Sequence, residues 1–481
     1  MEEQLYEMLL NYGKSDYYPC HMPGHKRNSK ELPQEDIFSM DITEIDGFDN
    51  LHHPTGIIKL EEERAARMYG AEHTFFLVNG STAGNLSAIS ACVKRGGKLL
   101  VARNCHKSVY HAIYLNELQV EYIYPQILGE YGLVGCIRPE EIQKALERDP
   151  EIEAVMITSP TYDGMISDVA EIARVVHRFD IPLIVDEAHG AHFGLDDTCP
   201  RNALQQGADV VIHSLHKTLP CLTQTALLHM QGQRVSYEQI ARYQSIYQST
   251  SPSYILLSSM TRGLSYVREQ GKEAFLRLWE NLDWFYEKVK GCKKLKVMDE
   301  RTVLEQGVFA FDRSKIIIST VGADCNGEQL SDLLRERFHI EMEMSAPTYV
   351  QAIMSIMDTR EGFERLAEAI LILDKELEPS GITKKTEYSQ IYSNENKPEI
   401  ASSIYQSQNA KRIKVNLEEA VGKISADYIY FYPPGIPLIT PGEIITEKSM
   451  QVWKSCHDTF TNIYGIDSDG NVYITTMDEN R

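Results

Sequence analysis

Short apolar runs alternate with amphipathic helical patterns through the middle of the chain. The apolar runs predict strands at residues 99–102, 154–158, 183–185, 210–212 and 225–229. A helix is predicted between two of them, at residues 168–180, where Asp168 and Glu171 have the spacing of a capping box. Because strand–helix–strand units cross over with a right hand, this alternation favours a parallel sheet with helices on both faces. The sequence therefore predicts an α/β fold.

Two charged residues follow predicted strands of this sheet. Asp186 closes the apolar run 181–185, and Lys217 comes after the run 210–212. Parallel strands bring such side chains to the carboxyl edge of the sheet, where α/β folds bind ligands. Pyridoxal phosphate (PLP) needs an amine that forms an imine with its aldehyde and a carboxylate that keeps its pyridine nitrogen protonated. Either residue alone is more simply a helix cap or a solvated lysine, but the ordered pair favours a PLP site.

A candidate phosphate cradle precedes this pair. The segment 75–97, FFLVNGSTAGNLSAISACVKRGG, has the pattern of a strand, a glycine turn and a helix. Backbone amides at the start of a helix bind phosphate, so we expect Gly80, Ser81, Thr82 and Ala83 to form the cradle. The turn alone is weak evidence, because Ser and Thr begin many helices. Its position ahead of Asp186 and Lys217 strengthens the interpretation.

Further motifs extend over most of the chain, and together they resemble the successive motifs of the Orn/Lys/Arg decarboxylase family, of PLP fold type I. They are HMPGHK (21–26), DGFDNLHHPTGIIKLEE (46–62), TFFLVNGSTAGN (74–85), RNCHKSVYHA (103–112), SPTYDG (159–164), DEAHGAH (186–192), HSLHKTLP (213–220) and STSPSY (249–254). The run NLEEAVGKISADYIYFYPPGIPLITPGEIIT (416–446) is similar to the separate C-terminal domain of that family.

The resemblance implies the architecture of the aspartate aminotransferase-like fold. We expect a large domain with a mainly parallel seven-stranded sheet, a smaller α/β domain and a C-terminal decarboxylase domain. The predicted division is an N-terminal arm (1–50), the PLP-binding large domain (51–278), the small domain (279–377), a linker or excursion (378–411) and the C-terminal domain (412–481).

The resemblance also implies roles for site residues. Lys217 would carry the imine, Asp186 would pair with the pyridinium nitrogen, and His106 would stack on the ring. His189 stands where several family members carry Trp, and it would contact the cofactor hydroxyl. The residues expected to hold the phosphate or line its pocket are Ser81, Thr82, Ser214 and His216, with His216 also a candidate proton donor.

The phosphate site is expected to be shared between subunits. Thr250 or Ser251, in STSPSY, would complete the phosphate site of a neighbouring subunit. The protein would then be at least a homodimer.

The implied reaction is α-decarboxylation of a basic amino acid. Arginine, giving agmatine for polyamine biosynthesis, is the first expectation, because HMPGHK has too few residues ahead of it for the wing domain of the larger family members. The missing wing also favours a dimer or tetramer over a decamer. Lysine and ornithine remain alternatives, since no distal carboxylate is identified. Tyr162 and Asp163 could face the substrate or serve only as a turn.

Other functions are weighed against this one. DEAHG also resembles the α-oxoamine synthases, but those carry glycines shortly after the lysine, and no glycine occurs here between Lys217 and Gly232. An aminotransferase would need an arginine for the substrate α-carboxylate. A catalytically silent regulator of a homologue would be expected to lose Lys217 or Asp186, and both are present.

Composition indicates which partners and which cellular compartment to expect. A formal net charge of −21 argues against nucleic-acid binding. No apolar stretch is long enough to span a membrane, and the first ten residues are acidic, unlike a signal peptide. Nine cysteines without a CxxC pair indicate reduced thiols and no zinc site. We therefore expect a cytoplasmic protein that binds neither nucleic acid nor membrane.

Overall fold

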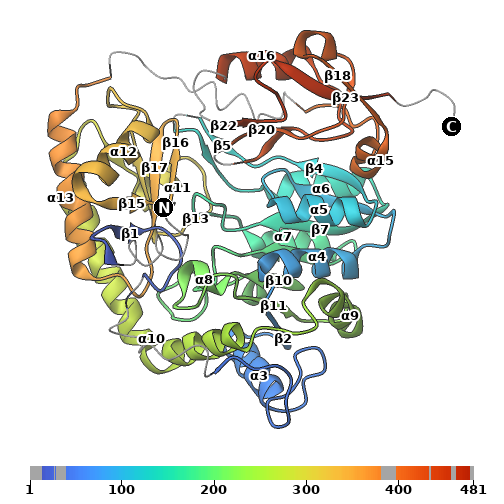
Figure 1. Ribbon diagram of the computed structural model, residues 1–481, viewed down its shortest axis with the longest axis horizontal. Coiled ribbons are helices and arrows are strands. Elements are labelled where there is room, and N and C mark those ends of the chain that lie inside the picture. The colour runs from blue at the N-terminus through green and yellow to red at the C-terminus, as the bar shows by residue number, and fades with distance from the viewer. Residues whose placement is uncertain are drawn as a thin grey trace, which may run out of the picture.

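The computed structural model describes residues 14–26, 28, 40–129, 131–380, 397–432, 435–456 and 462–476. Figure 1 shows a central large domain, a smaller domain built from residues coloured yellow to orange, and a C-terminal part in red. The first ten residues, on which the signal-peptide expectation depends, lie outside the described residues, as do residues 381–396 of the predicted linker. In the described part, no helix combines the length and the apolar character needed to cross a bilayer.

A seven-stranded sheet forms the centre of the large domain, as predicted. In spatial order its strands are β2 (His73–Leu77), β11 (Ala226–Met230), β10 (Val210–His213), β9 (Leu183–Asp186), β7 (Ile152–Thr158), β3 (Lys98–Ala102) and β4 (Gln119–Ile123). Strand β11 is antiparallel to β2 and β10, and all other neighbouring pairs are parallel. The expectation of a mainly parallel sheet in an α/β fold is therefore confirmed.

Both faces of the sheet are buried, which explains why its strands read as continuous apolar runs. Alternate residues of one strand belong to different cores, since Ile184 packs in one cluster and Leu183 and Val185 in the other. Helices α4 (Gly80–Cys92), α5 (Lys107–Leu115) and α9 (Tyr237–Tyr247) contribute to the first cluster. Helices α3 (Ile57–Tyr69), α6 (Pro139–Arg148) and α7 (Val169–His177) contribute to the second, to which η1 (Leu204–Gln206) also adds Leu204.

The predicted helix after Asp168 is present as α7. The carboxylate of Asp168 accepts a hydrogen bond from the backbone N–H of Glu171, as a helix cap does. The side chain of Glu171 turns to Arg174 instead of back toward the cap. The start of the helix is therefore fixed by Asp168.

A long helix connects the large and small domains. Helix α10 (Tyr254–Val289) has 36 residues, and the predicted boundary between residues 278 and 279 falls within it. The small domain contains an antiparallel sheet of β12 (Lys296–Val297), β14 (Lys315–Ser319), β17 (Tyr349–Ile353) and β16 (Met344–Ala346). Its helices are α11 (Glu300–Leu304), α12 (Gly327–Phe338) and α13 (Arg360–Glu376).

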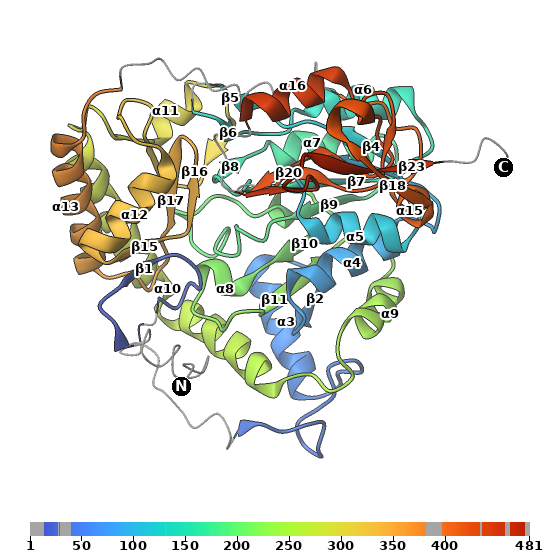
Figure 2. The same cartoon turned by 45° about the horizontal axis from the view of Figure 1, so that its top comes forward.

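Two small pairings join other segments to these domains. Strand β13 (Ala310–Phe311) pairs with β8 (Met165–Ile166), which follows the central strand β7. The arm strand β1 (Tyr18–Cys20) pairs with β15 (Ile340–Met342), so the arm lies against the small domain (Figure 2). A hairpin of β5 (Ile127–Leu128) and β6 (Leu133–Val134) extends beyond β4.

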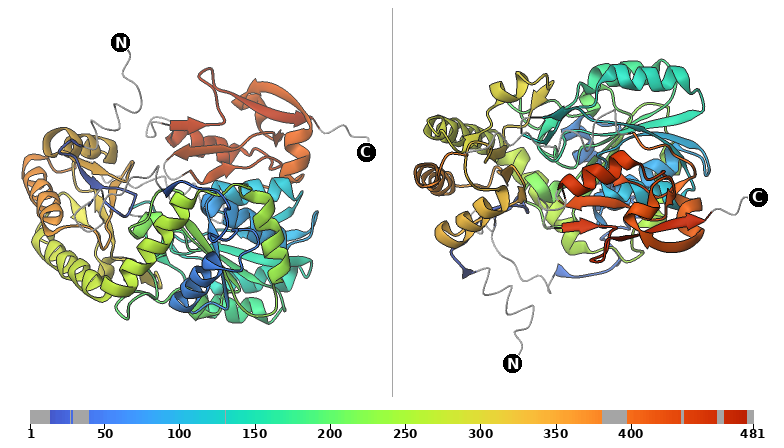
Figure 3. Two further views of the ribbon diagram at one scale, coloured as in Figure 1. Left: turned by 60° about the horizontal axis from the view of Figure 1, so that its bottom comes forward. Right: turned by 90° about the horizontal axis from the view of Figure 1, so that it is seen from above.

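The C-terminal part has its own small core and rests on the large domain (Figure 3). One sheet contains β18 (Lys411–Asn416), β23 (Asn471–Thr476) and β19 (Ile424–Ser425), and another contains β21 (Pro437–Ile439), β20 (Ile429–Tyr432) and β22 (Asn462–Tyr464). Its helices are α15 (Ile404–Asn409), η3 (Leu417–Ala420) and α16 (Glu447–Cys456).

A buried ion pair fixes this part to the large domain. Arg103, directly after β3, is fully buried, and its Nη1 and Nη2 each lie 2.8 Å from a carboxylate oxygen of Glu443. Nε and Nη2 also donate to the carbonyl oxygens of Pro437 (3.1 Å) and Leu438 (3.2 Å). The guanidinium also lies 4.4 Å from the ring centroid of Tyr122. Four hydrogen bonds therefore compensate for the burial of this charge.

We predict that Arg103→Met destabilises the protein by about 3–5 kcal/mol, because it leaves the carboxylate of Glu443 buried without its partner. Urea unfolding of the full-length protein measures the effect. Arg95→Met, which removes an exposed ion pair with Glu117, is the control and should leave the midpoint unchanged. Equal midpoints for the two variants would contradict the structural role given to Arg103.

Candidate active site

A cavity of about 800 Å³ opens at the carboxyl ends of the central strands. Its walls come from the start of α4, from the loops after β3, β7, β9 and β10, and from the C-terminal part. The predicted site residues that line it are Ser81, Thr82, His106, Asp186, His189, Ser214, His216 and Lys217. Ala83 and Thr250 are not among its lining residues. Segments far apart in the sequence thus meet at one edge of the sheet, where α/β folds bind ligands.

Lys217 projects from a short helical turn, α8 (Leu215–Thr218), that follows β10. Its Nζ lies 3.0 Å from Nε2 of His189. Burial lowers the pKa of Lys217, while the charges of Asp186 and Glu343 oppose that shift. A lowered pKa increases the share of neutral amine near neutral pH, and the neutral amine is the nucleophilic form.

Asp186 is the last residue of β9 and is almost completely buried. Its carboxylate accepts hydrogen bonds from Nδ2 of Asn85 (2.8 Å) and from the backbone N–H of Ala188 (3.1 Å). Asn85, on α4, also donates to Oγ of Ser108 at 2.9 Å. Asn85 was not expected from the sequence, where its only signal is that it is a polar residue among the small residues of α4. Asn85 links the aspartate to the helix that forms the cradle.

The start of α4 can accept an anion. Gly80, its first residue, has φ +71°, and the side chain of Asn79 before it makes no capping hydrogen bond. The first-turn amides are therefore not capped by that side chain, and the hydroxyl groups of Ser81 and Ser214 meet at 2.6 Å beside them. Ala83 lies further along α4 and is buried. The amides and hydroxyls of this corner fit a phosphate group.

Two buried polar oxygens of the cavity wall support a polar ligand. Oγ1 of Thr158 and Oδ1 of Asn104 are buried and have no hydrogen-bond partner among the described residues. Such groups are costly unless a ligand or water binds them. The donor set, the cradle, Asp186 and Lys217 together fit PLP.

The other histidines of the cavity are held by neighbouring groups. His106 caps α5, and its Nδ1 accepts a hydrogen bond from the backbone N–H of Ser108 at 3.2 Å. Nδ1 of His216 donates to the carbonyl oxygen of Thr225 at 2.9 Å, which leaves Nε2 as the nitrogen able to exchange a proton. Burial lowers the pKa of both side chains, so both rings are mainly neutral near pH 7.

His189 lies between two lysines. Its Nε2 contacts Lys217, and its Nδ1 lies 3.1 Å from Nζ of Lys315. The ring edge also meets the ring of Tyr162, with the centroids 4.8 Å apart. Burial, followed by the charges of Lys217 and Lys315, lowers the pKa of His189 well below its ordinary value. Lys315 comes from the small domain and was not expected from the sequence.

Tyr162 and Asp163, in the loop after β7, both line the cavity and both bind the small domain. The hydroxyl of Tyr162 donates to Glu343 at 2.6 Å. The buried carboxylate of Asp163 accepts from the hydroxyl of Tyr349 (2.7 Å) and the backbone N–H of Val134 (2.9 Å). The loop therefore ties the large domain to the small one, in addition to any contact with substrate.

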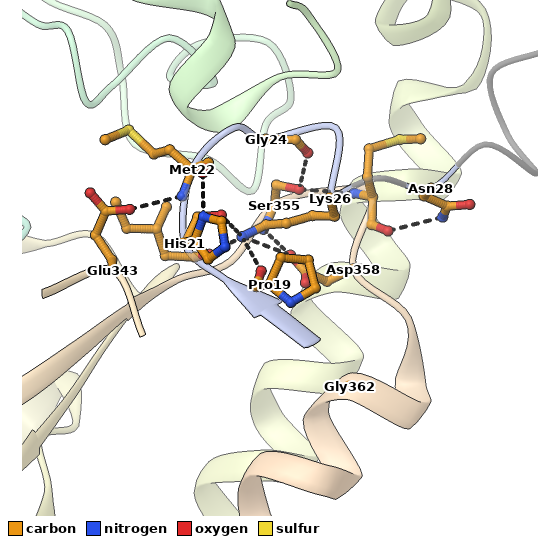
Figure 4. Close-up of polar contacts among 12 residues, drawn as sticks. Pro19, His21, Met22, Gly24, Lys26, Asn28, Glu343, Ser355, Asp358 and Gly362 are labelled. Carbon is orange, nitrogen blue, oxygen red and sulfur yellow. Dashed lines mark hydrogen bonds and ion pairs between the residues drawn. The ribbon is translucent and has the colours of Figure 1, made fainter. Parts of the chain in front are cut away.

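The HMPGHK segment lies on the small domain, as Figure 4 shows, and it also reaches the lysine loop. The backbone N–H of Met22 donates to Glu343 at 2.8 Å, and that of Gly24 donates to the carbonyl oxygen of His216 at 2.7 Å. A Cβ at Gly24 would lie 2.8 Å from the carbonyl oxygen of Leu219, so only glycine allows this approach. The arm therefore contacts the backbone beside Lys217.

Lys26 secures the other end of this segment. It is buried, and its Nζ donates to the carbonyl oxygens of Pro19 (3.1 Å) and His21 (2.9 Å) and lies 3.8 Å from Asp358. Oγ of Ser355 donates to the carbonyl oxygen of Gly24 at 2.6 Å. These contacts, drawn in Figure 4, hold the arm on the small domain.

Thr250 lies on the surface, in the connection between α9 and α10. The neighbouring Ser249 accepts a hydrogen bond at its carbonyl oxygen from Nε2 of His52 at 2.8 Å. The described chain does not bring Thr250 to its own cavity. Its predicted phosphate contact would therefore need a second subunit.

The family of the chain follows from its match to two family models. Residues 3–328 match the Orn/Lys/Arg decarboxylase major domain, and residues 382–463 match the Orn/Lys/Arg decarboxylase C-terminal domain. The fold is PLP fold type I. The chain belongs to the Orn/Lys/Arg decarboxylase family, which makes it a PLP-dependent amino-acid decarboxylase by family.

Curated relatives agree with this assignment. The chain is 30% identical over 455 residues to an arginine decarboxylase of Bacillus subtilis (strain 168), covering 93% of this chain and 92% of the relative. It is 32% identical over 452 residues to an arginine decarboxylase of Halalkalibacterium halodurans, covering 93% and 91%. Lysine decarboxylase LdcA of Pseudomonas aeruginosa is 24% identical, with 96% of this chain and 77% of the relative covered.

Solved structures show the same fold. The lysine decarboxylase LdcF of Francisella novicida superposes with a TM-score of 0.77 at 21% identity, covering 99% of this chain and 81% of that one. An alanine–glyoxylate aminotransferase of Nostoc sp. superposes with a TM-score of 0.57 at 14% identity, covering 74% and 94%.

The pH dependence of stability tests the burial of Asp163. Burial raises its pKa to about 6, above the value of about 3.9 expected in the unfolded chain. The folded state then holds this proton more tightly, so the stabilisation is present below about pH 4 and is lost as the pH rises through 6. We predict that, from pH 4 to 7, the wild type loses roughly 2–3 kcal/mol of unfolding free energy relative to Asp163→Asn. Urea unfolding at each pH measures this difference, and a difference between the two proteins that stays constant from pH 4 to 7 would contradict the prediction.

Proposed function

We propose that the protein catalyses the PLP-dependent α-decarboxylation of L-arginine to agmatine and carbon dioxide. The observation that carries this proposal is the meeting of Lys217, Asp186 and the uncapped start of α4 in one cavity. An amine, an acid partner for a pyridine nitrogen and a phosphate cradle are the groups that PLP chemistry requires. PLP, when bound, supplies the ring that accepts the electrons of the broken carbon–carboxylate bond.

The residues of the chain provide binding and proton transfer. Ser81, Thr82 and Ser214 would hold the phosphate at the start of α4. Asp186, oriented by Asn85, would keep the pyridine nitrogen protonated. His106 would contact the cofactor ring. Amides that are fixed before the ligand arrives add binding without reorganisation.

Two groups are available to move the proton that replaces the carboxylate. Nζ of Lys217 would be one of these groups, because its lowered pKa favours proton exchange near neutral pH. Nε2 of His216 is the second candidate, because Nδ1 is fixed by the carbonyl oxygen of Thr225. Walls from the large domain and the C-terminal part enclose this site and reduce its contact with water.

The proposed substrate is supported by the relatives and by the cavity wall. The curated arginine decarboxylases share about 30% identity with the chain, while the lysine decarboxylase shares 24%. The C-terminal part contributes Asp427 and the rings of Tyr428 and Tyr430 to the wall, and a carboxylate beside aromatic rings suits a cation. Lysine is the second candidate, because the superposed Francisella structure is a lysine decarboxylase.

The residues that line the cavity also argue against the aminotransferase and the silent homologue. No arginine occurs among the described residues that line the cavity, so the described chain offers no arginine there for the α-carboxylate that an aminotransferase grips. Lys217 and Asp186 both lie in the cavity, unlike what is expected of a silent homologue. A cytoplasmic location is part of this proposal, and the buried free thiols of Cys20, Cys105 and Cys136 support it.

Release of carbon dioxide and amine from arginine, lysine and ornithine, each offered separately to the PLP-loaded protein, tests the function. Agmatine from arginine is the expected product, and Lys217→Ala should lose at least 99% of the activity, on the order of the losses seen when a covalent catalyst is removed. Cadaverine or putrescine as the main product would overturn the substrate. Absence of gas from all three would overturn the reaction.

We further propose that two subunits share each active site. Thr250 is exposed, and the surface near it carries the half-exposed apolar side chains of Phe48 (48%), Ile57 (47%) and Leu60 (50%). Residues 49–56 lie beside this segment, because Tyr254 donates to the carbonyl oxygen of Asp49 and His52 bonds to Ser249. An exposed apolar patch next to an unused phosphate ligand fits a subunit interface.

Subunit mixing tests the sharing. Lys217→Ala and the double variant Thr250→Val/Ser251→Ala should each be impaired alone, but co-expression should restore activity, because one site of a mixed dimer then carries neither change. Failure of the mixture to exceed the two parents would contradict a shared site.

A further inference from the structure

Three nitrogen-bearing side chains lie in a row from the small domain to the reactive lysine. Nζ of Lys315 lies 3.1 Å from Nδ1 of His189, and Nε2 of the same ring lies 3.0 Å from Nζ of Lys217. Lys315 is the first residue of β14 and is fully buried, although its charge would favour water. A buried lysine needs a physical reason to be there, because burial of an ammonium is costly.

The position of Lys315 is fixed along its whole length. Its backbone N–H donates to the carbonyl oxygen of Asp312 at 3.0 Å. Gly164, with φ +87°, passes over the stem so closely that a Cβ there would lie 2.7 Å from Cγ of Lys315. The ring of Tyr162 meets that of His189 from the side. Lysine and imidazole therefore have little freedom to separate.

The donors and acceptors of the three side chains limit how hydrogen bonds can run between them. An ammonium can only donate, and a neutral imidazole has one N–H and one accepting nitrogen. Both lysines cannot be ammonium ions bonded to a neutral His189, because both ring nitrogens would then have to accept. If Lys315 keeps its charge, Nδ1 accepts from it, Nε2 carries the hydrogen, and Lys217 must offer a lone pair.

We propose that Lys315 is a positioning residue, whose ammonium donates to Nδ1 of His189 and so directs the Nε2–H of that ring at the neutral amine of Lys217. Lys217 is thereby held as an oriented nucleophile, and the contact forms only when the small domain is seated on the large one. The inference deepens the proposed function, since it concerns the lysine assigned there to the cofactor.

Charged groups from several elements face the two lysines. Burial lowers the pKa of Lys315 to about 8, against the opposing charges of Asp312 and Glu343 and with a smaller contribution from Lys217 and Lys26, so that the ammonium persists at pH 7. Asp186 and Glu343 face Lys217, with burial lowering its pKa. The cavity wall holds further titratable groups, which are Cys105, His106, Lys107, Tyr110, Tyr162, Asp163, His216, Asp427, Tyr428, Tyr430 and Tyr464.

Competitive labelling of the cofactor-free, full-length protein with acetic anhydride tests the proposal. Nζ of Lys217 attacks the acetyl carbon, acetate leaves, and the amine loses its proton to water, so the extent of labelling follows the neutral amine. Peptide mass spectrometry across pH 6 to 10 gives the apparent pKa of Lys217. We expect Lys315→Met to raise it by about one unit, which is a tenfold smaller neutral fraction at pH 7.

Control variants separate an effect passed through His189 from the effect of removing any lysine of this sheet. Lys296→Met, on the adjacent strand β12, removes another lysine of the same sheet and should leave the apparent pKa of Lys217 unchanged. When His189→Leu is already present, Lys315→Met should shift the apparent pKa of Lys217 by less than half of the shift that it causes in the wild type. If Lys315→Met does not fold, as judged by its thermal transition, Lys315→Gln carries the same expectation.

An unchanged apparent pKa for Lys217 in the Lys315 variants would overturn the proposal. An equal pKa shift from Lys296→Met, or an undiminished shift in the His189→Leu background, would show that Lys315 does not act on Lys217 through His189. The labelling needs no cofactor and no turnover, so it is independent of the decarboxylation assay. A protein that fails to decarboxylate but shows the expected shift would refute the proposed function and retain the role of Lys315.

Discussion

The seating of the small domain over the carboxyl edge of the parallel sheet is the constraint on which the site depends. Parallel strands place Asp186 and the lysine loop at the same edge, but an edge alone is open to water. Contacts from β14, β17 and the β15–β16 connection hold His189, Asp163 and Tyr162 at this edge, through Lys315, Tyr349 and Glu343. Because these contacts are buried and polar, a displaced small domain would leave several of them unsatisfied.

Because the small domain packs here, several segments near Lys217 are bonded both to it and to the large domain. The HMPGHK arm bonds both to Glu343 and to the backbone of His216, and the loop of Tyr162 bonds to the small domain and touches His189. Substitution in the arm should therefore affect the lysine loop through backbone contacts. The C-terminal part is fixed separately, by the Arg103–Glu443 pair, and it supplies the aromatic wall of the cavity.

Much of the architecture could be predicted, because strand burial leaves a direct mark on the sequence. Strands such as residues 183–185 are apolar on both faces, and the helix after Asp168 has its cap in the sequence. The residues of the cradle and the pair of Asp186 and Lys217 could be predicted from their order along the chain. Asn85 could not, because its function depends on facing Asp186 across the sheet edge.

By itself the sequence determined the parallel α/β fold, the family and the candidate residues for a cofactor site, because strand period, turn chemistry and motif order are local properties. Only the tertiary structure decided which of those candidates share a cavity and which buried groups shift in pKa. Lys315 is an ordinary strand residue in the sequence, yet it lies 3.1 Å from His189. Asp163 follows a strand as a turn residue would, yet burial between two domains raises its pKa to about 6. Burial and the approach of distant charges arise only when the domains pack, so no local pattern encodes them.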